Sequence, residues 1–65
     1  MNTKTVFSVQ YNGSRYQVRK ISIDFSSYVT FDILQDRRVI KAKYYSERSA
    51  ILELLQIIRL KIIQL

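Results

Sequence analysis

Alternating apolar and polar positions run along the first part of the chain, and an apolar-rich stretch without glycine or proline follows. The clearest local feature is Asn12-Gly13, which has alternating runs on both sides. Asn-Gly favours a two-residue type I′ turn, because both central residues must adopt positive φ. Such a turn pairs Val9 with Tyr16 and gathers the apolar side chains on one face of a hairpin, which supports this register.

The alternation changes phase after Arg19. Val18 and Ile21 are three positions apart, so a regular strand would place them on opposite faces. A β-bulge near Arg19-Lys20 would return Ile21 and Ile23 to the core side and bend the strand. The alternative is that the strand ends at Arg19.

A second hairpin is predicted from two segments rich in β-forming residues, Tyr28–Leu34 and Arg38–Tyr45. A tight turn at Asp36-Arg37 joins them. In this register Asp32 lies beside Lys41 on the face away from the core, which is a favourable cross-strand charge pair.

The C-terminal stretch predicts a helix. Ser46 suits the N-cap position and Glu47 the first turn, where the helix dipole favours an anion. One helical face collects Ile51, Leu54, Leu55, Ile58, Ile62 and Leu65. One sheet cannot cover the apolar residues that remain, so we expect a homodimer whose interface includes Leu52, Ile57, Leu60 and Ile63. A helix lying on a membrane surface is the competing interpretation, but its polar face holds few cations.

These elements predict a single domain over residues 1–65, with a sheet at 3–45, a loop at Phe25-Ser26-Ser27 and a helix at 46–65. The fold class is α+β in the order ββββα, with a four-stranded or alternatively three-stranded antiparallel sheet. A domain this small usually needs extra stabilisation from disulfides, a bound metal or a partner subunit. The chain has no Cys and no His, which excludes disulfides and ordinary zinc sites and leaves oligomerisation.

Missing residue types also limit the chemistry. Without His or Cys, the commonest general base and the thiol nucleophile are absent, and one glycine cannot form a phosphate-binding loop. We therefore expect neither an enzyme nor a cofactor. The N-terminus has no signal-peptide pattern, and no apolar stretch is long enough to span a membrane, so a cytoplasmic location is expected.

The net charge of +6 favours an anionic partner, although basic residues also simply keep small apolar domains in solution. The predicted registers place Arg15, Arg19, Lys41 and Lys43 on one sheet face with Tyr28 and Tyr45, and Arg37 and Arg38 extend this strip at the turn. Cations that meet phosphates and rings that stack on bases suit single-stranded nucleic acid. Because this face points away from the core, replacing Arg19 or Lys43 is expected to weaken binding without unfolding the protein.

The alternative function is a non-enzymatic protein-interaction module, such as an inhibitor, an adaptor or an assembly subunit of the phage or plasmid accessory kind, that docks through the apolar helix. Four antiparallel strands followed by a dimerising helix resemble the Pur-alpha repeat and Whirly-type single-strand binders. Three strands and a C-terminal helix also resemble the arm-binding domain of phage integrases, in which Tyr44–Ala50 would be the passage from strand to helix. The resemblance covers the order of elements and carries over no functional residue.

Overall fold

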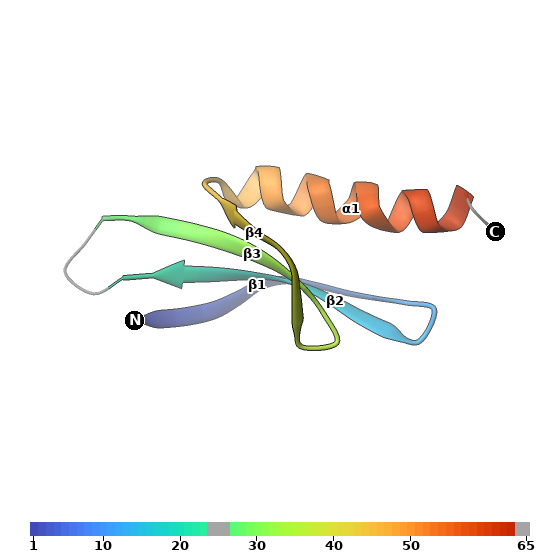
Figure 1. The fold of residues 1–65 in the computed structure, drawn as a ribbon, viewed down its shortest axis with the longest axis horizontal. Helices are drawn as coiled ribbons and strands as arrows, with labels where there is room; N and C mark the ends of the chain where they lie inside the picture. The colour runs from blue at the N-terminus through green and yellow to red at the C-terminus, as the bar shows by residue number, and fades with distance from the viewer. Residues whose placement is uncertain (24–26, 64–65) are drawn as a thin grey trace.

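The fold is a four-stranded antiparallel sheet with one helix on it, and the computed structural model describes residues 1–23 and 27–63. The elements are β1 (Asn2–Tyr11), β2 (Ser14–Ser22), β3 (Val29–Gln35), β4 (Arg38–Tyr44) and α1 (Glu47–Ile63). The strands lie side by side in chain order, and α1 runs along one face of the sheet (Figure 1). The predicted ββββα order is confirmed. The expected loop residues 25–26 and helix residues 64–65 lie outside the described part.

The turn between β1 and β2 has the predicted type I′ geometry. Asn12 has φ 51° and Gly13 has φ 83°, and the strands pair Val9 with Tyr16 as expected. A Cβ atom added at Gly13 would meet no other atom within 4 Å. The need for glycine therefore comes from the backbone conformation alone and not from crowding.

The predicted bulge in β2 is wrong, because the irregularity lies in β1, between Thr5 and Phe7. β2 is paired on both sides, so a bulge there would disturb two hydrogen-bonded ladders, whereas β1 is an edge strand with one ladder. β2 instead keeps a regular register with β3 as far as Ser22, so Ile21 lies on the face opposite Val18. As a result Ile21 is half-buried and Ile23 is exposed, so neither joins the core.

The second turn is also confirmed at Asp36-Arg37, where the φ values are 50° and 72°. Gln35 pairs with Arg38, which makes this a two-residue turn with positive φ at both central positions. An L-residue in the left-handed region costs about 1–2 kcal/mol, and this turn holds two of them without glycine.

The register of β4 differs from the expected one, in which Lys41 lies beside Asp32. Lys41 pairs with Ile33 instead, and the ladder is irregular on both sides of this pair. Lys43 has φ 67°, and its backbone N–H donates to Asp32 Oδ1 at 3.3 Å. β4 is an edge strand, so these irregularities disturb a single ladder. Because Ile33 is a core residue, its partner Lys41 lies on the helix side of the sheet.

The hydrophobic core lies between α1 and the sheet. Its buried members come from β2, β3 and α1 and are Tyr16, Val18, Phe31, Ile33, Ala50, Leu54 and Ile58. Burying each large apolar side chain contributes roughly 1.5–3 kcal/mol, which fixes α1 on this face. The opposite face is left without a covering helix in the part of the chain described here (Figure 1).

The start of α1 follows the prediction. The Ser49 backbone N–H donates to Ser46 Oγ at 3.0 Å, and the Ala50 N–H donates to the Ser46 carbonyl oxygen at 3.1 Å. Ser46 is therefore the N-cap, which satisfies a backbone donor that would otherwise lack a partner.

The face that α1 buries is rotated from the expected one. Ala50 is fully buried, whereas Leu55 and Ile62, which were expected in the core, are exposed. The small side chain of Ala50 allows the helix to lie close to the sheet at this point. Two residues, Tyr45 and Ser46, connect β4 to α1, and so short a link helps to set which helical face meets the sheet.

Candidate nucleic-acid interface

The open face of the sheet carries the β2 and β3 side chains that point away from the core. Gln17 pairs with Leu34 and Arg19 pairs with Asp32 across these strands. Leu34 and Asp32 are both buried although α1 covers the other face. β3 is flanked by β2 and β4, so side chains from both neighbours enclose these residues. The side chains along the centre of the open face are therefore packed against their neighbours, and some of them are shielded from solvent.

A hollow of about 430 Å³ lies at the end of this face, where the two hairpin turns meet. Its lining residues are Arg15, Gln17, Asp36 and Arg37. Two hydrogen bonds fix their arrangement: the Asp36 N–H donates to the Arg15 carbonyl oxygen at 2.9 Å, and the Arg15 N–H donates to Asp36 Oδ1 at 3.0 Å. They tie the second turn to β2 and bring Arg37 and Arg15 to one hollow.

The carboxylate in the hollow is engaged by neighbouring donors. The backbone N–H of Arg15 and then the side chain of Ser14 lower the pKa of Asp36 below its ordinary value. Asp36 therefore stays charged while it holds the turn in place, and it compensates part of the charge of the two guanidinium groups. The hollow keeps a net positive charge.

Arg19 lies further along the same face, and its charge is already compensated. Arg19 Nη2 is 3.4 Å from Asp32 Oδ2, and Asp32 is 8% exposed. Arg19 Nε is buried and has no hydrogen-bond partner among the described residues. Removing Arg19 would leave a buried carboxylate without its counterion. We therefore expect replacement of Arg19 to lower the stability of the fold, a cost that the sequence analysis did not include.

Two exposed tyrosines lie at the other end of the sheet. Tyr28 precedes β3 and Tyr45 follows β4, and their rings pack edge to face with centroids 5.9 Å apart. Their exposed fractions are 51% and 68%, so ring surface remains open to solvent. A hydrogen bond with Tyr45 raises the pKa of Tyr28 above its ordinary value. The two tyrosines therefore contact each other, but they are separated from the hollow by the length of the sheet.

Two of the remaining predicted cations, Lys41 and Arg38, do not join this face. Lys41 Nζ is 4.0 Å from Glu53 Oε1 of α1, which confirms that Lys41 lies on the helix side. Arg38 pairs with Gln35, which points to the same side. Lys43 is exposed and contacts Asp32 through its backbone. The irregular register of β4 separates these cations, and a regular register had been assumed.

The structure also adds residues that the sequence analysis did not select as site residues, Gln17 and Asp36. Gln17 carried a usable signal, because it alternates with Arg15 and Arg19 along β2. Asp36 carried none, because its place beside Arg15 depends on how the two hairpins align with each other.

The residues expected at a dimer interface divide into two groups. Leu52, Leu60 and Ile63 are exposed, whereas Ile57 packs partly against the core. Leu55 and Ile62 are exposed as well. The five exposed side chains range from 44% to 67% exposed, which is a large apolar surface for one helix.

Comparison with protein-family models, curated protein sequences and solved structures found no match. Within residues 1–23 and 27–63, no His, Cys, Asp or Glu side chains form a group that could hold a metal ion. The same residues include no helix that is long and apolar enough to cross a membrane. The function is therefore inferred from the open face and from the exposed surface of α1.

Proposed function

We propose that the protein binds single-stranded nucleic acid along the open face of its sheet. The observation that carries the proposal is the hollow, which is lined by arginines from two different hairpins, Arg15 and Arg37, together with Gln17. Guanidinium groups bind phosphate oxygens in a forked geometry, and amides donate to phosphates and to bases. The sequence-wide charge of +6 adds a long-range attraction to the same partner.

The conformation of Arg37 supports a role for its side chain. Its φ of 72° lies in the left-handed region, where glycine or asparagine is the favoured residue. Unfavourable backbone conformations cluster at binding sites, where another requirement outweighs their cost. We infer that the place of Arg37 in the lining of the hollow is such a requirement.

The tyrosine pair supplies the second element of the proposed surface. Seven residue steps along β2 separate Arg15 from Ser22, which is next to the tyrosine end, and this corresponds to about 23 Å. At 3.4 Å or more per nucleotide, that length accommodates at most about seven nucleotides. A strand could then place phosphates at the hollow and a base against Tyr45, because stacking on an aromatic ring tolerates any base.

The test is a fluorescence anisotropy titration of a labelled oligothymidine at two salt concentrations. Replacing Arg15 or Arg37 by Gln should weaken binding and reduce the salt slope by about one for each lost phosphate contact. Arg48→Gln is the matched control, because Arg48 is exposed on α1 and carries the same charge. An equal loss of affinity in the control and in the hollow variants would show a dependence on net charge alone and refute the proposed site.

The exposed apolar surface of α1 favours a second candidate function, protein binding. We propose that a second copy of the chain covers this surface, which would make the protein a homodimer. Burying the five side chains would remove the large apolar patch from solvent. Sedimentation equilibrium at micromolar concentration tests the proposal, and a monomeric mass over the whole concentration range contradicts it.

A further inference from the structure

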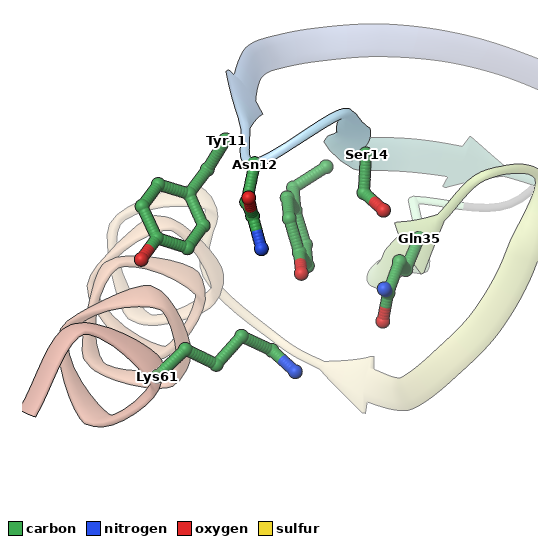
Figure 2. A pocket seen from close by; sticks show the side chains of 6 residues that line it. Tyr11, Asn12, Ser14, Gln35 and Lys61 are labelled. Atoms are coloured by element: carbon green, nitrogen blue, oxygen red, sulfur yellow. The ribbon is translucent and has the colours of Figure 1, made fainter. Parts of the chain in front are cut away.

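A second cavity lies on the helix side of the sheet, away from the proposed nucleic-acid surface. Its volume is about 220 Å³, and its lining residues are Tyr11, Asn12, Ser14, Tyr16, Gln35 and Lys61. Figure 2 shows Lys61 extending from α1 below the β1–β2 turn toward Gln35, with the ring of Tyr11 beside the helix. The cavity is thus bordered by the first hairpin, the end of β3 and the last turns of α1, and it is open to solvent on one side.

Two of the side chains that line this cavity, those of Tyr16 and Lys61, can donate hydrogen bonds to a ligand. Tyr16 is 2% exposed, and its side chain both packs in the core and lines the cavity. A tyrosine hydroxyl can donate one hydrogen bond and can also accept one. Lys61 forms no ion pair within residues 1–23 and 27–63. A hydroxyl and an ammonium group are therefore both available to a ligand.

The lining also has a definite charge. It contains one cation and no carboxylate among the described residues, and the rest are hydroxyl and amide groups. Such a set suits an anion that accepts several hydrogen bonds. A water molecule occupies about 30 Å³ in the liquid, so the cavity is larger than one phosphate group requires. Space remains next to the ring of Tyr11 for a small organic group attached to the phosphate.

We propose that this cavity binds a small phosphate monoester, with the phosphate held by Lys61 Nζ and the Tyr16 hydroxyl and the attached group lying against Tyr11. The site is independent of the proposed nucleic-acid surface, because the two lie on opposite faces of the sheet and share no lining residue. The competing explanation is that Lys61 serves the last turn of α1, where a cation compensates the helix dipole.

The test is an NMR titration of ¹⁵N-labelled protein with ribose 5-phosphate, with inorganic phosphate and ribose as separate probes. Ribose 5-phosphate should cause saturable shifts in the amides of Asn12 and Gln35, inorganic phosphate should cause weaker ones, and ribose none. Equal shifts with ribose would show that no phosphate is recognised and would overturn the proposal. Shifts confined to the amides around Arg15 and Arg37 would overturn it as well, since they report the other face.

Variants separate binding from stability. Tyr16→Phe should lower the affinity for ribose 5-phosphate by about tenfold or more, as for the loss of a hydrogen bond to a charged group. Its melting temperature without ligand should stay close to that of the wild type, because the ring that packs in the core is kept. Lys61→Gln should abolish the shifts, and Arg59→Gln, which removes a cation from the same end of α1 outside the cavity, should retain them. If Lys61→Gln lowers the melting temperature while affinity stays unchanged, Lys61 serves the helix and the proposal is wrong.

Discussion

The ion pair between Arg19 and Asp32 offers the sharpest test of the open face. Replacing Arg19 by Met removes the charge and keeps most of the apolar stem. Asp32 then retains the backbone N–H of Lys43 but no counterion. Removing one partner of a fully buried pair costs about 3–5 kcal/mol. The Arg19 side chain is 33% exposed and the contact is long at 3.4 Å, so solvent screens part of the interaction.

We therefore expect Arg19→Met to lower the free energy of unfolding by about 2 kcal/mol, below the range for a fully buried pair. A chain of this length has roughly 3–10 kcal/mol of stability in total. The melting temperature should fall by about 8–16 °C, which circular dichroism measures directly. This loss is large enough to explain reduced binding by itself, so Arg15 and Arg37 are better probes of function than Arg19.

The double variant provides the control. Asp32→Asn removes the charge but keeps an oxygen that can accept the N–H of Lys43. In Arg19→Met/Asp32→Asn no buried charge remains unpaired, so the double variant should be more stable than Arg19→Met alone. A loss below about 0.5 kcal/mol in Arg19→Met, or strictly additive losses in the double variant, would mean that solvent screens this pair as it does on an ordinary surface.

Four further predictions address the turns, the apolar helix and the aromatic end. Gly13→Val should cost about 1–2 kcal/mol and Gly13→Asn much less, because open space surrounds the site and only the positive φ opposes a side chain; equal melting temperatures contradict this. Because the folded-state pKa of Asp36 is lowered, its stabilising contribution is present above the unfolded pKa and disappears as pH falls through the folded value. Acid titrations of wild type and Asp36→Asn should therefore converge, and parallel curves contradict the assignment. Leu55→Gln with Ile62→Gln should shift the proposed dimer toward monomer in sedimentation, without destabilising the monomer. Tyr45→Ala should weaken oligothymidine binding by roughly 1–3 kcal/mol and leave the salt slope unchanged, and a changed slope argues against stacking.

The features that the sequence predicted correctly are those that neighbouring residues determine. Asn12-Gly13 and Asp36-Arg37 each lie between two strand segments that are adjacent in the sequence, and both residues of each pair adopt the positive φ of a two-residue turn. Ser46 caps α1 because its side chain reaches the backbone N–H three residues ahead. None of these features depends on how distant elements meet.

The features that the sequence did not predict depend on tertiary contacts. The apolar pattern changes phase after Arg19, but β2 has a partner on each side and contains no bulge; the bulge lies in β1, and Ile21 stays outside the core. The irregular ladder of β4 moves Lys41 to the helix side and divides the predicted basic strip. The burial of Ala50 rotates α1 and leaves Leu55 in solvent. In each case a contact with another strand or with the sheet determines the position of these residues, and the apolar pattern along a single strand or helix does not contain that information.

The chain-order arrangement of the strands has a consequence for folding kinetics. Every strand pairs with its neighbour in sequence, so the sheet forms through short loop closures, and such topologies fold quickly for their size. The core is completed by α1, which follows all four strands. A sheet that forms first would expose Val18 and Ile33 until the helix docks. Leu54→Ala weakens the packing of the helix. It should therefore lengthen the lifetime of a sheet-rich intermediate with exposed apolar side chains and promote aggregation during refolding.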